Sequence, residues 1–202
     1  MEIQTQFINP FPVELLVRDF EMPPNWNENL DLFIRTQVFK NQQIYNPNNP
    51  SMFDEINIFA NEYVDKSEEL QILYKMFYDG FKDLALHSDP NILPESISKM
   101  DFKGKVPFMK SGDFKKVHNH VKADAYGIFY LNEIAPKSGG QLILHHPVFH
   151  NQVYYTAPAE YPIPHKKNRL IVGPSYVWHE VSYYSGKTER QVISADCNLF
   201  WT

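Results

Sequence analysis

The sequence contains a single cysteine, Cys197, and only eight glycines among 202 residues. One cysteine cannot form an intramolecular disulfide, so the composition does not indicate a disulfide-stabilised secreted fold. The glycines form no phosphate-binding loop, no dinucleotide-binding fingerprint and no nucleophile elbow. Nucleotide-loop enzymes and serine hydrolases are therefore disfavoured.

Long apolar runs and basic clusters are also missing. No segment approaches the roughly 18 consecutive apolar residues of a membrane-spanning helix, and the opening MEIQTQF lacks the apolar stretch of a signal peptide. Nineteen Lys and Arg against 24 Asp and Glu give a net charge of −5, and no basic stretch is long enough to follow a phosphate backbone. We therefore expect a cytoplasmic protein that spans no membrane and binds no nucleic acid.

What is present is the composition of one folded domain, residues 1–202. Hydrophobic residues make up 43% of the chain and charged residues 21%, which is typical of a globular protein. The 12 Tyr, 15 Phe and 3 Trp favour strands over a helical bundle. We expect a core rich in β-sheet.

Residues 1–95 are predicted to form a helical support region. Apolar residues recur with the helical period from Trp26 to Val38, after Pro23 and Pro24. A second helix is predicted to begin after Ser67 as its N-cap and to end before Pro90. The stretch from Asn41 to Phe53 is rich in Asn and Pro and is expected to be a loop.

Residues 96–202 are predicted to form a β core. Short extended runs alternate there with turns rich in Ser and Gly. The candidate strands are Ile97–Phe108, Ala123–Leu131, Gln141–Leu144, Arg169–Val172, Val177–Tyr183 and Gln191–Asn198. This spacing is typical of a sandwich or barrel, so we expect a mainly β fold with the helices packed on one side of a double-sheet core.

Histidines are concentrated in the β core, where seven of the eight occur. His118 and His120 are two residues apart, so on a strand both would project from one face and converge on one metal ion. His179 follows 61 residues after His118 and offers a third ligand if its strand lies beside the first. A histidine pair alone is weak evidence, since two surface histidines beside lysines would have the same pattern.

Arg190 strengthens the metal hypothesis. It follows His179 by eleven residues across a Ser-Gly-Lys turn, so a hairpin would bring its guanidinium near the metal, where it could bind a carboxylate. The alternative is a surface ion pair with Glu180 or Glu189. We expect the other histidines of the core to be structural or to lie at the rim: His145, His146, His150 and His165.

Four blocks of the β core, taken in order, resemble a known family. They are HNHVKADAYGIFYLNE, SGGQLILHHP, YPIPHKKNRLIVGPSYVWHEV and GKTERQVISADCN, within residues 102–198. Their order and spacing resemble the core of the 2-oxoglutarate- and Fe(II)-dependent dioxygenases, in particular a small bacterial and phage branch that is distantly similar to prolyl 4-hydroxylases. The resemblance implies a double-stranded β-helix, the jelly-roll core that is also found in cupins.

The resemblance also implies roles for individual residues. His118 and His179 would bind iron, and Arg190 would bind the far carboxylate of 2-oxoglutarate. Ser194 or Tyr130 would add a hydroxyl to that carboxylate. The implied cofactors are Fe(II), 2-oxoglutarate as cosubstrate and O2, and the products would include succinate and CO2.

The chain departs from the family at one position, because His120 stands where the family has Asp or Glu. If His120 binds the metal, the site is a neutral three-histidine face similar to that of cysteine dioxygenase. If it does not, two histidines hold the iron, or Asp124 reaches in from further along the chain. Asn168 replaces a common Gly, which fits because Asn also tolerates a left-handed backbone.

Three functions remain open at this point. The first is a 2-oxoglutarate-dependent hydroxylase of unknown substrate, for which the similarity to prolyl hydroxylases favours a peptide or protein side chain. The second is a three-histidine cupin-type dioxygenase that does not use 2-oxoglutarate, and the third is a non-catalytic jelly-roll module with a closed metal site. We expect the tyrosines from Tyr154 to Tyr161 to pack as an ordinary loop and not to form a lid. The predicted helices could pack on the sheet or form a homodimer interface, and the sequence does not decide between the two.

Overall fold

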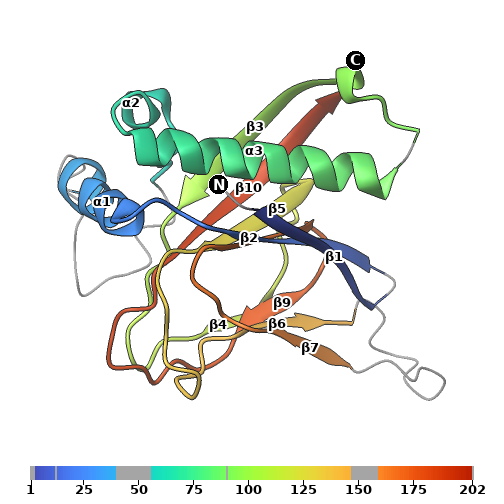
Figure 1. Cartoon of the computed structure of the whole chain (residues 1–202). Coiled ribbons are helices and arrows are strands. Elements are labelled where there is room, and N and C mark those ends of the chain that lie inside the picture. Colours follow the sequence, from blue (N-terminus) through green and yellow to red (C-terminus); the bar gives the residue numbers. More distant parts are fainter. Residues whose placement is uncertain (1–2, 12, 40–55, 90, 147–158, 202) are drawn as a thin grey trace.

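The computed structural model describes residues 3–11, 13–39, 56–89, 91–146 and 159–201. These residues form two antiparallel sheets and a layer of helices (Figure 1). The larger sheet contains, in spatial order, β1 (Ile3–Phe11), β2 (Val13–Phe20), β8 (Arg169–Pro174), β5 (Ala125–Tyr130), β10 (Val192–Trp201) and β3 (Ile97–Lys105). The smaller sheet contains β4 (Lys115–His118), β9 (His179–Val181), β6 (Leu142–His145) and β7 (Glu160–Ile163).

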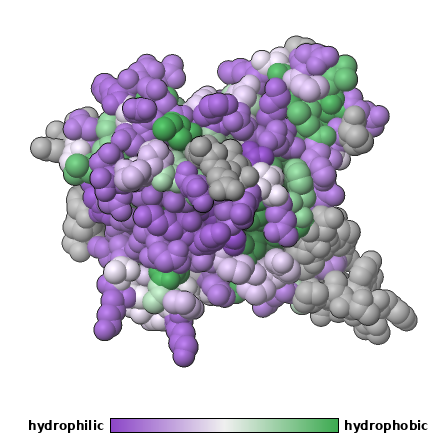
Figure 2. Space-filling view, viewed as in Figure 1, coloured by the Kyte–Doolittle hydropathy of each residue, from purple (hydrophilic) through white to green (hydrophobic). Residues whose placement is uncertain are grey.

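The helices cover one face of the larger sheet, and the smaller sheet lies on its other side (Figure 1). The helical elements are α1 (Trp26–Phe33), the π-helical turn η1 (Ile34–Phe39), α2 (Asn61–Val64), α3 (Glu68–Ser88) and the 3₁₀ turn η3 (Pro94–Ser96). The surface in the same view is mostly hydrophilic (Figure 2). This arrangement confirms the predicted double-sheet core with helices packed on one side.

Helix α3 has both features from which it was predicted, an N-cap and an apolar face. The Ser67 side chain accepts a hydrogen bond from the Leu70 N–H at 3.2 Å, which caps the first turn. The apolar face packs against β2, β5 and β8. Contact is so close that a Cβ atom on Gly127 of β5 would lie 2.7 Å from the Phe77 ring, so glycine is required there.

The N-terminal region differs from the prediction. Residues 3–20, expected in the helical support region of residues 1–95, form β1 and β2 at one edge of the larger sheet. In β2, Val13, Leu15, Leu16 and Val17 are all buried, because helices cover one face of the sheet and the smaller sheet covers the other. A strand buried on both faces shows no alternation of apolar and polar residues, so β2 lacked the sequence pattern by which a strand is recognised.

Smaller differences concern element ends. The helix expected from Trp26 to Val38 is α-helical only to Phe33 and continues as the π-helical turn η1. The strands β4 and β7 were not predicted; each has four residues, and β7 contains Pro162. The loop predicted from Asn41 to Phe53 lies outside the described residues. The six predicted strands are all present, with shifted ends.

Asn168 adopts the left-handed conformation that was predicted, with φ 63°. Its side-chain oxygen accepts a hydrogen bond from the Asn27 amide at 2.7 Å, and the same amide also donates to the Leu131 carbonyl at 2.8 Å. Helix α1 is thereby tied to the end of β5. No helix within the described part of the chain combines the length and apolarity that crossing a bilayer requires.

Candidate metal centre and cavity

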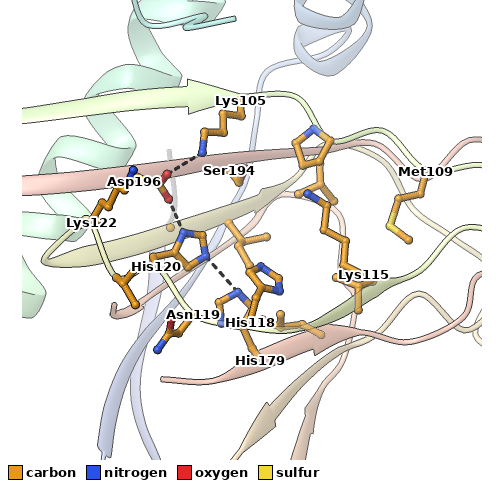
Figure 3. Close-up of a pocket in the computed structure, with 18 of the residues that line it drawn as sticks. Lys105, Met109, Lys115, His118, Asn119, His120, Lys122, His179, Ser194 and Asp196 are labelled. Atoms are coloured by element: carbon orange, nitrogen blue, oxygen red, sulfur yellow. Dashed lines mark hydrogen bonds and ion pairs between the residues drawn. The ribbon is translucent and has the colours of Figure 1, made fainter. Parts of the chain in front are cut away.

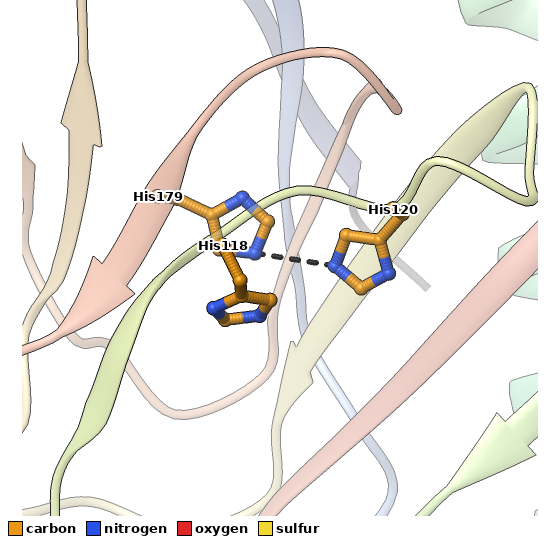
Figure 4. Close-up of side chains that lie close together, drawn as sticks. All are labelled: His118, His120 and His179. Carbon is orange, nitrogen blue, oxygen red and sulfur yellow. Dashed lines mark hydrogen bonds between the residues drawn. The ribbon is translucent and has the colours of Figure 1, made fainter.

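The three predicted histidines lie together at one end of the space between the sheets. His118 ends β4 and is the cross-strand partner of His179, the first residue of β9. His120 lies in the turn after β4, where its backbone N–H donates to the Ser175 carbonyl at 3.0 Å. One ring nitrogen from each histidine lies within 4.8 Å of the others (Figure 4). The antiparallel pairing of β4 with β9 therefore brings together His118 and His179, which are 61 positions apart in the sequence.

The second nitrogen of each ring is held by an acceptor. Nδ1 of His118 lies 2.7 Å from the Lys116 carbonyl, and Nδ1 of His179 lies 3.0 Å from the Val177 carbonyl. Nδ1 of His120 lies 2.5 Å from a carboxylate oxygen of Asp196. Each Nδ1 therefore faces a hydrogen-bond acceptor, which leaves Nε2 as the nitrogen whose lone pair a metal can use.

These lone pairs fit a bound cation. Nε2 of His120 lies 3.2 Å from Nε2 of His179, within hydrogen-bond distance, and a metal bound by both nitrogens would replace that hydrogen bond (Figure 4). Burial, together with the neighbouring His118 and His120, lowers the pKa of His179 to about 3, and burial also lowers the pKa of His118. Neutral imidazoles are good ligands for Fe(II), Zn(II), Ni(II) and Cu(II). The residues present thus fit a transition-metal ion.

A cavity of about 380 Å³ adjoins the three histidines (Figure 3). Its charged lining residues are Lys105, Lys115, Lys122, Arg190 and Asp196. Four cationic side chains against one carboxylate contrast with the net charge of −5 for the chain. A cavity of this charge attracts anions.

Arg190 is the buried cation of this cavity, with 2% of its surface exposed. Its Nη1 donates to the Met109 sulfur at 3.4 Å, and its Nε has no hydrogen-bond partner in the described part of the chain. The alternative ion pairs do not form between the described residues: Glu189 pairs with Arg35, and Glu180 lies 3.8 Å from His145. Burial lowers the pKa of Arg190, but an arginine remains charged. A buried charge without a carboxylate partner is costly unless an anionic ligand binds it.

Ser194 and Tyr130 occupy different positions relative to Arg190. Ser194 lines the cavity from β10. Tyr130 is fully buried on β5 beside Val192, and its ring centroid lies 5.5 Å from the Arg190 guanidinium carbon. Its buried hydroxyl interacts with the Arg190 guanidinium. Ser194 therefore faces the cavity directly, whereas Tyr130 lies behind Arg190.

The remaining candidates lie apart from the metal centre. The Asp124 carboxylate is exposed and accepts the Leu199 N–H at 2.8 Å. The His165 ring lies against Tyr130 with centroids 4.2 Å apart and planes tilted by 50°, and its Nε2 lies 2.8 Å from the Asn132 carbonyl. Tyr161 packs against the core between the sheets. His150, Tyr154 and Tyr155 lie outside the described residues.

The site residues that the sequence reasoning missed include Asp196 and Lys105. The signal for Asp196 was present, because Arg190, Val192, Ser194 and Asp196 follow at intervals of two and all line the cavity. Lys105 could not be found in this way, since its place beside Asp196 depends on the pairing of β3 with β10.

The two antiparallel sheets form a double-stranded β-helix, with the histidine cluster at one side of the cavity between them. No family model and no curated protein sequence matches the chain. Solved structures do, and they show the fold that the resemblance implied.

Three of these structures are prolyl hydroxylases. A prolyl 4-hydroxylase of Pseudomonas putida is 18% identical, with a TM-score of 0.55, and the match covers 90% of this chain and 85% of that one. A prolyl 4-hydroxylase of Phytophthora capsici is 17% identical, with a TM-score of 0.58, over 92% of this chain and 58% of that one. The viral collagen prolyl hydroxylase of Paramecium bursaria Chlorella virus-1 is 13% identical, with a TM-score of 0.55, over 92% of this chain and 90% of that one.

Proposed function

We propose that the chain is an Fe(II)- and 2-oxoglutarate-dependent dioxygenase that hydroxylates a substrate and releases succinate and CO2. The observation that carries this proposal is Arg190, a buried cation without a carboxylate partner in the described residues, in the same cavity as three converging imidazole nitrogens. The fold supports it, because the similar solved structures include prolyl hydroxylases and a non-heme α-ketoglutarate-dependent carbocyclase.

The chain's own residues have separate tasks in this proposal. His118, His120 and His179 hold Fe(II) through Nε2 and leave the side toward the cavity open. Arg190 binds the far carboxylate of 2-oxoglutarate, with Ser194 and Tyr130 as the candidate hydroxyl partners. When bound, Fe(II) and 2-oxoglutarate supply the oxidising chemistry with O2. Met109 and Val192 supply apolar lining in the same cavity as Arg190.

For the substrate we propose a peptide or protein side chain. The structures named above are prolyl hydroxylases, including one that acts on collagen. The cavity is open to solvent beside exposed lysines such as Lys122, so a chain segment can reach it from outside.

A second candidate is a three-histidine dioxygenase that does not use 2-oxoglutarate. It is favoured by His120, since the described cluster contains three imidazoles and no carboxylate ligand. It leaves Arg190 without an anion to bind. A closed structural metal site is disfavoured, because the three nitrogens adjoin a cavity and no fourth ligand joins them among the described residues.

An anaerobic titration separates these candidates. Fe(II) is added to the protein, followed by 2-oxoglutarate, and the visible absorption band of the Fe(II)–2-oxoglutarate complex is recorded. We expect a band in the wild type, and in Arg190→Ala we expect a band that needs at least about tenfold more 2-oxoglutarate, because a charge-assisted bidentate contact is lost. Lys116→Ala is the matched control, since Lys116 is exposed on β4 and does not line the cavity.

The outcomes are distinct. Fe(II) binding without a band at any 2-oxoglutarate concentration would favour the three-histidine alternative. Absence of Fe(II) binding would refute the proposed function. Thermal unfolding of Arg190→Ala, measured in parallel, shows whether a lost band reflects an unfolded variant.

A further inference from the structure

His120 is the histidine that departs from the usual ligand pattern, and it is held differently from the other two. His118 and His179 contact backbone carbonyls through Nδ1, whereas His120 contacts the carboxylate of Asp196. A carboxylate is a stronger acceptor for an imidazole N–H than a neutral carbonyl. The cavity's one lining carboxylate therefore acts on this histidine.

Asp196 is itself held in place. Its second carboxylate oxygen accepts a hydrogen bond from Lys105 Nζ at 2.7 Å (Figure 3). Burial would raise the pKa of Asp196, but the contacts with His120 and Lys105 outweigh it and lower the pKa to about 2. Asp196 lies on β10 and Lys105 on the adjacent strand β3, so the orientation of the carboxylate is set by the larger sheet.

Stacking fixes the plane of the His120 ring but not its direction. The ring lies nearly parallel to Tyr126 and to His179, with centroid distances of 5.1 and 5.0 Å and interplanar angles of 15°. A half-turn of the ring within this stack would preserve both contacts and replace Nε2 by a carbon on the side that faces His179. Only the orientation with Nδ1 toward Asp196 points the Nε2 lone pair at the metal centre.

We propose that Asp196 is a positioning residue that selects the metal-binding orientation and tautomer of His120. The inference rests on the proposed metal site. In the family that the sequence resembles, a carboxylate residue stands at the position of His120; here a carboxylate instead contacts the far nitrogen of His120, from strand β10. Lys105 completes the arrangement by holding the other oxygen of Asp196.

The first test uses the metal-free protein. Nitrogen-15 NMR of the histidine rings reports which nitrogen carries the proton. We expect His120 in the wild type to be protonated at Nδ1, and in Asp196→Ala to show a mixture of tautomers. Asp101→Ala is the matched control, since Asp101 is exposed on the neighbouring strand β3 and does not line the cavity. An unchanged His120 tautomer in Asp196→Ala would overturn the proposal, whether or not the protein binds a metal.

The second test measures affinity for Co(II) by its visible spectrum. Loss of a carboxylate behind a metal-binding histidine weakens metal binding by about 10- to 100-fold, and we expect that loss in Asp196→Ala. The same substitution is then made in a His120→Asp background, where no imidazole remains for Asp196 to orient. We expect a change of less than about twofold there.

The comparison of backgrounds separates a positioning role from a general structural one. An equal loss of Co(II) affinity in both backgrounds would mean that Asp196 only stabilises the sheet, and would refute the proposal. If the wild type bound neither Co(II) nor Fe(II), the proposed function would fail, while the tautomer measurement would still decide the role of Asp196.

Discussion

Arg190 and Cys197 show how the surroundings of a buried side chain decide its role. Arg190 and Cys197 are both almost inaccessible, but they face opposite sides of the larger sheet. Arg190 lines a cavity and keeps part of its hydrogen-bonding capacity unused, which is consistent with ligand binding. Cys197 packs in the apolar core under the helices, where its thiol has no access to solvent.

At the residue scale, we expect Cys197 to be unreactive in the folded protein. Its exposure is 0%, and burial, with smaller contributions from Asp124 and Asp101, raises the pKa of its thiol to about 12. A disulfide-exchange reagent followed by absorbance should label the native protein on the order of a thousandfold more slowly than the urea-unfolded protein, because labelling requires opening of the core. Equally fast labelling in both states would show that β10 is not packed under the helices.

Part of the candidate site could be predicted from the sequence, because short spacings and the family resemblance pointed to its residues. His118, His120, His179 and Arg190 were found from short spacings and from resemblance, and the structure brings them to one cavity. Asp196 was missed because sequence reasoning stopped at the ligands, although its interval from Arg190 placed it on the same face.

At the element scale, an ion-pair group joins β2 to β8. The Asp19 carboxylate accepts hydrogen bonds from Arg169 Nε at 2.7 Å and Nη2 at 3.0 Å, and from Lys166 Nζ at 2.7 Å. Burial would raise the pKa of Asp19, but these contacts outweigh it, so its pKa is lowered. Because the pKa is lower in the folded state, the stabilisation is complete above the ordinary carboxyl pKa and is lost as the pH falls through the folded value.

We therefore expect Asp19→Asn to lower the free energy of unfolding by about 1–2 kcal/mol at pH 7 and by much less at pH 3. Urea unfolding at the two pH values measures the difference. Asp65→Asn, at an exposed position after α2, controls for the loss of one negative charge. A deficit that stayed the same at pH 3 would contradict the role assigned to the Asp19 carboxylate.

Elements with local signals were predicted well, and those without were not. Helix α3 has an N-cap and a clear apolar face, so its start and end were foreseen. Strands β1 and β2 were missed, because β2 is apolar on both faces and is recognisable as a strand only through its pairing with β8. The order of strands in each sheet depends on such long-range pairing and was not predicted; the family resemblance implied only a double-stranded β-helix.

At the scale of the whole molecule, the metal centre joins distant parts of the chain. Its ligands come from β4, β9 and the turn between β4 and β5, and Asp196 comes from β10. Binding of a metal to the assembled site should therefore stabilise the entire fold.

We expect Co(II) at 100 times its dissociation constant to add about 2.7 kcal/mol of stability, which raises the melting temperature by about 5–10 °C for a chain of this size. Differential scanning calorimetry measures the shift. In His179→Ala the shift should vanish, whereas in His87→Ala, which alters a surface contact with Glu14, it should persist. A shift that survived His179→Ala would place the metal elsewhere.

The two faces of strand β10 contact different parts of the molecule. Residues 192, 194 and 196 line the cavity, whereas residues 193, 195 and 197 pack under the helices. Substitutions at neighbouring positions of this strand therefore have different effects, one set on the cavity and the other on the packing of the core. During divergence, the specificity of the cavity can change along one face of this strand while the other face keeps the fold intact.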